Sequence, residues 1–104
     1  MSDIKILEQR AREIRSRYNE LELKRDGKPW NARKLAEGFR NDVNELIEIL
    51  QKSPPDEKKL NHELADCLWS VLVIARAANV DIEKAFWTTM GELDKRLDGL
   101  LNES

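Results

Sequence analysis

The residues best suited to chemistry in this chain are acidic pairs spaced three residues apart. Asp42 and Glu45 form one pair, and Glu63 and Asp66 form another. In a helix, the two carboxylates of each pair lie on one face and point the same way. Oxygen ligands of this kind suit Mg²⁺ or Mn²⁺, whereas zinc sites favour His and Cys. The chain has twenty acidic residues, so several such pairs are expected by chance and the spacing alone is weak.

The two pairs are placed symmetrically about a break in the helical pattern. Asp42 and Asp66 are each twelve residues from Pro54, and Glu45 and Glu63 are each nine residues from it. In an antiparallel helical hairpin that bends at Pro54, both pairs would lie at matching heights. Four converging carboxylates repel one another, and a hard divalent cation would relieve that repulsion. The alternative is that these carboxylates pair with Lys or Arg across a helix interface.

The single histidine and the single cysteine limit the other kinds of site. His62 lies about 100° from Glu63 around its helix, and di-iron bundles need two Glu-x-x-His pairs. We therefore expect His62 at the surface or supporting a ligand, rather than as a ligand itself. Cys67 has no partner for a disulfide or for a cysteine-based zinc site, which is typical of a reducing, cytoplasmic compartment.

The elements that must position the carboxylates read as helices throughout. Apolar residues recur every three or four positions from Asp3 to about Asp26 and again from Leu35 to Leu50. Breaks follow at residues 27–30 and 53–55, with Asn31 and Asp56 as N-caps of the next helices. The third helix runs from Glu57 to about Ala78, and the fourth begins at Ile82 after the N-cap Asp81. We predict an all-α fold, a single domain over residues 1–104 that consists of four helices around an antiparallel helical hairpin.

Size and charge restrict the classes of partner. A domain of 104 residues buries only about two-thirds of its unfolded surface. The third helix is apolar almost all round after Asp66, so we expect it to be buried on every side. A net charge of −2 argues against a binder of nucleic acid polymers. No apolar run approaches the roughly 20 residues of a membrane span, and Met1–Arg10 lacks the apolar core of a signal peptide. We expect no membrane partner.

The pairs and their surroundings also match a known pattern. Asp42-Val43-Asn44-Glu45 and Glu63-Leu64-Ala65-Asp66 are followed by Cys67–Leu72 and by the turn Asn79-Val80-Asp81-Ile82, and Arg25 to Trp30 precede them. With these motifs the chain, from Tyr18 to Met90, resembles the MazG-like all-α nucleoside triphosphate pyrophosphohydrolase superfamily. That superfamily carries E-x-x-E and E-x-x-D motifs on two antiparallel helices that bind magnesium.

The resemblance implies hydrolysis of a (d)NTP to a (d)NMP and pyrophosphate, as in nucleotide-pool house-cleaning. Asp42, Glu45, Glu63 and Asp66 would bind Mg²⁺, with Mn²⁺ as a possible substitute. Glu45 and Glu63 would be catalytic, with Glu45 the first choice as the base. The resemblance also implies a bundle completed by oligomerisation, as a homodimer or homotetramer. The candidate substrate contacts are Arg25, Lys28, Trp30 and Trp69. Each has an alternative role without substrate, either as a solvated charge or in core packing.

Two departures from the superfamily pattern leave other functions open. Asp42 is shorter than the usual Glu. Beyond Met90 the chain lacks the Lys and Asn that some relatives direct at phosphate, and Lys95 and Arg96 are either substitutes or solvated charges. One rival function is a non-catalytic helical interaction or regulatory module with a degenerate site. The other is a metal-dependent phosphohydrolase for a different pyrophosphate compound.

Overall fold

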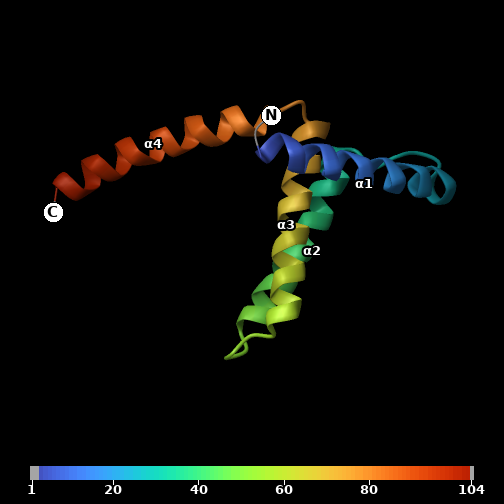
Figure 1. Cartoon of the computed structure of the whole chain (residues 1–104), viewed down its shortest axis with the longest axis horizontal. Coiled ribbons are helices and arrows are strands. Elements are labelled where there is room, and N and C mark those ends of the chain that lie inside the picture. Colours follow the sequence, from blue (N-terminus) through green and yellow to red (C-terminus); the bar gives the residue numbers. More distant parts are fainter. Residues whose placement is uncertain (1–2, 104) are drawn as a thin grey trace.

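The computed structural model describes residues 3–103 and shows an all-helical chain (Figure 1). Its helices are α1 (Asp3–Asp26), α2 (Ala32–Leu50), α3 (Glu57–Ala77) and α4 (Ile82–Asn102). The described residues contain no strand. These findings confirm the prediction of four helices. None of the described helices combines the length and the apolar character needed to cross a membrane.

Local capping explains why the helices begin where they do. The residue before each of α2, α3 and α4 is extended, and its side-chain oxygen accepts a hydrogen bond from a backbone N–H in the first turn. The bonds are Lys34 N to Asn31 Oδ1 at 2.9 Å, Lys59 N to Asp56 Oδ1 at 3.0 Å and Lys84 N to Asp81 Oδ1 at 3.1 Å. All three predicted N-caps are confirmed.

The end of α3 is fixed by a left-handed residue. Asn79 has φ 59°, a conformation that asparagine tolerates better than most residues. Its N–H donates to Arg76 O at 3.1 Å, and the N–H of Val80 donates to Ala75 O at 2.8 Å. This pair of bonds is the Schellman motif. It ends α3 and sets the path of the chain toward α4.

Helices α2 and α3 lie side by side and antiparallel, and α1 crosses the open end of this hairpin (Figure 1). The core forms at that crossing, where Ala11 of α1 meets Leu35 of α2 and both Leu72 and Val73 of α3. Farther down the hairpin, toward its bend, the buried residues among those described are the polar Ser70 and Glu63. The core therefore secures the open end of the hairpin, and the acidic pairs lie between the core and the bend.

The single chain leaves much of its apolar surface uncovered. Its radius of gyration is 17.0 Å, against about 13 Å for a compact domain of this length. Helix α4 projects away from the hairpin, and none of its described residues is buried (Figure 1). Within one chain, the expected burial of α3 on every side after Asp66 is not reached, because Leu68 is 47% exposed. No described helix of the same chain covers that face.

Candidate functional site

The four predicted carboxylates lie on facing parts of α2 and α3, in two overlapping groups. Asp42, Glu45 and Glu63 each place an oxygen within 4.8 Å of the others. A second group contains Glu63, Asp66 and a ring nitrogen of His62 within the same distance. Glu63 therefore links the two groups. We call Asp42, Glu45, Glu63 and Asp66 the acidic cluster.

Side-chain tilt changes the pairing expected from the symmetry about Pro54. Asp42 does not join Asp66 in one group; its Oδ2 accepts a hydrogen bond of 3.0 Å from Ser70 Oγ. Side chains lean toward the N-terminus of their own helix, so those of α2 lean away from the bend and those of α3 lean toward it. Asp42 consequently meets a residue one turn farther along α3 than equal spacing predicts.

The same tilt accounts for the position of His62. The side chain of Asp66 tilts toward the N-terminus of α3, where His62 lies one turn earlier. Its Oδ2 is 3.3 Å from His62 Nε2. The His62 side chain is 73% exposed. This location fits the expected surface or supporting role, in which the imidazole holds the Asp66 carboxylate.

Glu63 has the most unfavourable surroundings of the cluster. It is 5% exposed, and its buried Oε1 has no hydrogen-bond partner. Burial raises the pKa of Glu63 above its ordinary value of 4.5, and the negative charges of Glu45, Asp66 and Asp42 raise it further. A buried carboxylate among three others lacks the compensation that a cation would give.

The donor atoms of the acidic cluster suit a divalent cation. They are carboxylate oxygens, the ligands that hard cations prefer. Glu63, whose Oε1 lacks a hydrogen-bond partner, contributes an oxygen to this group. Among the described residues, no Lys or Arg forms an ion pair with Asp42, Glu45 or Glu63. The alternative of ion pairs across the helix interface is therefore not observed for these three carboxylates within residues 3–103.

One aromatic candidate lies close to the cluster. A methyl group built on Gly38 would lie 3.8 Å from Cζ3 of Trp30, so the indole rests against α2 at that glycine. Gly38 and Asp42 are one turn apart on the same face of α2, about 6 Å along its axis. A cavity of about 620 Å³ opens beside Trp30 and is also lined by Lys28 and by Lys34, whose Nζ is 5.4 Å from the ring centroid.

The other two candidates are placed differently. Trp69 lies between α1 and α3, where its ring is 5.7 Å from that of Tyr18 and its Nε1 donates to Ala11 O at 3.4 Å. Arg25 is exposed near the end of α1 and does not line the Trp30 cavity. The structure thus brings Lys28 and Trp30 to one cavity, which neither Trp69 nor Arg25 lines.

A buried ion pair that the sequence analysis did not identify holds the Trp30 loop. Glu22 is 2% exposed; it binds Arg15 and accepts a 2.7 Å hydrogen bond from the backbone N–H of Trp30. Glu22 lies four residues after Tyr18, on the continuation of the α1 stripe that contains Ala11. A charged residue in an apolar stripe is the signal that would have revealed it.

Comparison with known proteins supports the same interpretation of the hairpin. The family model described as the MazG nucleotide pyrophosphohydrolase domain matches residues 31–99, which include α2, α3 and most of α4. No curated protein and no solved structure gives a significant match. The matched segment is more than half of the chain and contains the whole acidic cluster. The chain therefore belongs to the MazG nucleotide pyrophosphohydrolase domain family.

Proposed function

We propose that this chain hydrolyses a nucleoside triphosphate, (d)NTP, to the monophosphate and pyrophosphate with Mg²⁺ or Mn²⁺. In this reaction the oxygen of a water molecule bonds to the α-phosphorus. The bond from that phosphorus to the oxygen bridging to the β-phosphate breaks, and pyrophosphate leaves with that oxygen. Family membership and the convergence of carboxylates on α2 and α3 support this assignment.

Asp42, Glu45, Glu63 and Asp66 would hold the cation. When bound, a divalent cation neutralises phosphate charge and acidifies a coordinated water. The observation that carries the proposal is the buried, unpartnered Oε1 of Glu63 among the other carboxylates. An unpaired buried acceptor is costly, and a hard cation is the ligand that suits it.

The two catalytic candidates differ in exposure, and this suggests different roles. Glu45 is exposed, so water and substrate reach its carboxylate, and we assign it the proton from the attacking water. Glu63 is buried at the junction of both groups and is the anchor of the metal site. Ser70, buried and bonded to Asp42, fixes the orientation of that shorter carboxylate.

The Trp30 cavity is the proposed site for the nucleoside. A base stacked on Trp30 would direct its phosphates along α2 toward Asp42, one turn beyond Gly38. Lys28 and Lys34 line the same cavity and supply positive charge beside it. Stacking on Trp30 alone would accept any base, because every base has a π-face. A preference for one base would come from the other residues that line this cavity.

We also propose that the chain works as a homodimer or homotetramer. Helix α4 has no buried residue among those described, and Leu97 and Leu101 are exposed along it. Apolar surface of this extent is typical of an interface between subunits. Replacing both leucines by Glu should shift the sedimentation coefficient toward that of a monomer. An unchanged coefficient would contradict the placement of the interface on α4.

Pyrophosphate release from a panel of NTPs and dNTPs, with Mg²⁺ or Mn²⁺, tests the activity. Glu63→Gln should lower turnover by at least about a hundredfold. The control Glu48→Gln removes the same charge from an exposed α2 position outside the acidic cluster and should retain activity. No turnover by the wild type, together with no thermal shift on adding metal, would favour the non-catalytic interaction module instead.

A further inference from the structure

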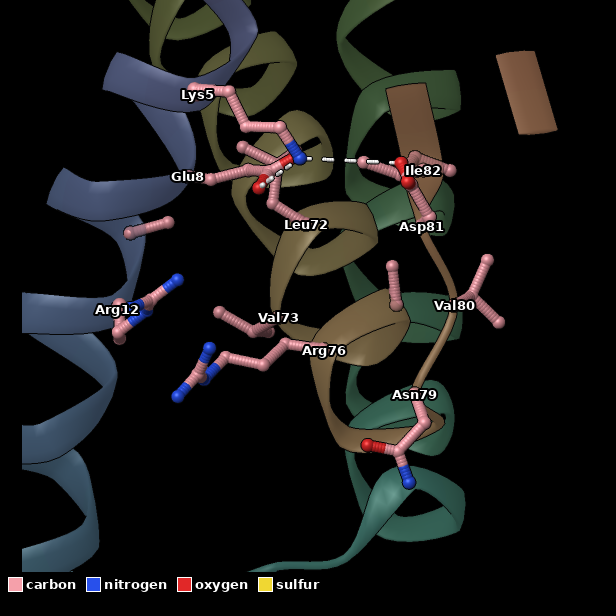
Figure 2. Close-up of a pocket in the computed structure, with 12 residues that line it drawn as sticks. Lys5, Glu8, Arg12, Leu72, Val73, Arg76, Asn79, Val80, Asp81 and Ile82 are labelled. Atoms are coloured by element: carbon pink, nitrogen blue, oxygen red, sulfur yellow. Dashed lines mark ion pairs between the residues drawn. The ribbon is translucent and has the colours of Figure 1, made fainter. Parts of the chain in front are cut away.

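A second pocket lies between α1 and the C-terminal part of α3 and is bordered on one side by the α3–α4 loop (Figure 2). Its volume is about 330 Å³. No carboxylate of the acidic cluster lines it. Arg76, which does line it, is about 15 Å along α3 from Asp66. This pocket is therefore separate from the proposed metal site.

Two guanidinium groups enter this pocket from opposite sides. Arg12 of α1 and Arg76 of α3 project into the gap between the helices and toward one another (Figure 2). Within residues 3–103, neither side chain has an ion-pair or hydrogen-bond partner, whereas Arg10 and Arg15 are each paired with a glutamate. Facing cations without a counterion repel one another. An anion between them would remove that repulsion and accept charge-assisted hydrogen bonds from both.

A buried acceptor lies one helical turn from this pair of cations. Glu8 lines the same pocket, and its buried Oε1 has no hydrogen-bond partner. Its other oxygen, Oε2, lies 3.6 Å from Lys5 Nζ, which is also 4.0 Å from Asp81 Oδ1 (Figure 2). Oε1 of Glu8 thus lacks a hydrogen-bond donor, and a ligand donor that reaches this side of the pocket would supply one.

The floor and the loop of the pocket are preformed. Leu72 and Val73 are buried and provide an apolar floor. The backbone bonds of Asn79 and Val80 to α3 hold the loop wall in place. A pocket with an apolar floor and a few convergent polar groups is the usual form of a small-molecule site.

We propose that this Arg12–Arg76 pocket binds a small phosphorylated ligand that also carries a hydroxyl or amine donor. The phosphate dianion bridges the guanidinium groups of Arg12 and Arg76, and the donor bonds to Oε1 of Glu8. A dianion matches two guanidinium charges better than a monocarboxylate does, and phosphate geometry suits the planar donor fork of arginine. This site lies outside the proposed catalytic centre and does not depend on its activity.

Titration calorimetry of the full chain in metal-free buffer tests the proposal, because without metal the acidic cluster repels phosphate. The probes are ribose 5-phosphate, inorganic phosphate and gluconate. Ribose 5-phosphate should bind more tightly than inorganic phosphate, and gluconate should bind least. Arg12→Gln and Arg76→Gln should each weaken binding of ribose 5-phosphate about tenfold, the effect of losing a hydrogen bond to a charged group. Binding of all probes should weaken with added salt.

Matched variants separate binding in this pocket from non-specific attraction to positive charge. Arg40→Gln removes the same charge from an exposed α2 position outside the pocket and should leave affinity unchanged. Glu8→Gln should reduce the preference for ribose 5-phosphate over inorganic phosphate. Glu63→Gln should not alter binding, so failure of the proposed hydrolase activity would leave this result intact. Absence of binding, or an equal loss in Arg40→Gln, would overturn the proposal.

Discussion

Replacement of Glu63 by glutamine should stabilise the metal-free protein and abolish its stabilisation by metal. Glu63 is buried, its Oε1 lacks a partner, and three other carboxylates surround it. Glutamine keeps the size of the side chain and removes the charge. Its amide N–H groups can donate to neighbouring carboxylates, which the native carboxylate cannot do. The variant should therefore be more stable than the wild type while no metal is present.

The magnitude follows from the cost of an unpaired buried polar group. This cost is about 1–3 kcal/mol. Because Glu45 is exposed and water reaches one side of the cluster, we take the lower end, about 1 kcal/mol. For a domain of this size, that corresponds to a rise in Tm of about 4–8 °C.

The pH dependence has a definite sign. The folded-state pKa of Glu63 is raised, first by burial and then by its acidic neighbours. The folded state therefore binds this proton more tightly than the unfolded state. Its contribution to stability is complete below the unfolded pKa and is lost as the pH rises through the folded pKa. The metal-free wild type should lose stability over that window as the pH rises, and Glu63→Gln should lose less.

Added Mg²⁺ should reverse the order of the two proteins. A ligand that binds only the folded state contributes about 2.7 kcal/mol at one hundred times its Kd. The wild type should gain roughly 10–20 °C in Tm under that condition, and the variant should gain little. Thermal unfolding followed by circular dichroism, with and without metal, gives both differences. Glu48→Gln should behave like the wild type in each.

Two outcomes would refute this reasoning. If Glu63→Gln is less stable than the wild type in metal-free buffer, its carboxylate is satisfied by a partner and is not a source of repulsion. If the variant retains the full stabilisation by Mg²⁺, the cation binds elsewhere.

Three further perturbations probe the surroundings of the cluster. Glu22→Ala leaves Arg15 buried without its partner and should lower the free energy of unfolding by about 3 kcal/mol. Urea unfolding measures this difference. The control Glu20→Ala, at an exposed position, should leave the free energy of unfolding almost unchanged. Trp30→Ala should raise KM for an NTP about tenfold with kcat retained, and an equal rise for a triphosphate without a base would count against stacking. Burial, and then the charges of Asp42, Glu63 and Asp66, raise the pKa of Cys67. Mg²⁺ should lower that pKa and speed alkylation at pH 8, whereas an unchanged rate would show that these charges are not neutralised.

Much of the fold could be predicted because its signals are local. Asn31, Asp56 and Asp81 cap helices through bonds that span only three residues, so the sequence around each contains the whole interaction. Asn79 ends α3 for the same reason. The direction of α4 was not predictable. An apolar stripe predicts that one face of a helix is buried, but it does not identify the helix that packs against that face.

The candidate site was predicted by residue type and only partly by arrangement. Equal spacing about Pro54 identified facing carboxylates. It paired Asp42 with Asp66, whereas Asp42 bonds to Ser70. Spacing along the chain predicts the heights of Cα atoms only. Each side chain tilts toward the N-terminus of its own helix, so the side chains of two antiparallel helices are displaced in opposite directions.

The sequence by itself determined the four helices, their caps and the oxygen chemistry of the acidic pairs, because each depends on residue type and on neighbours within a few turns. Only the tertiary structure decided that Glu63 is the buried member of the acidic cluster, with an Oε1 that lacks a partner, that Glu22 holds the Trp30 loop, and that Arg12 faces Arg76. These features depend on which faces of separate helices meet. The packing of those faces determines how deeply each charged group is buried and how far apart the charges lie. Burial and charge separation in turn set the free energy of each site.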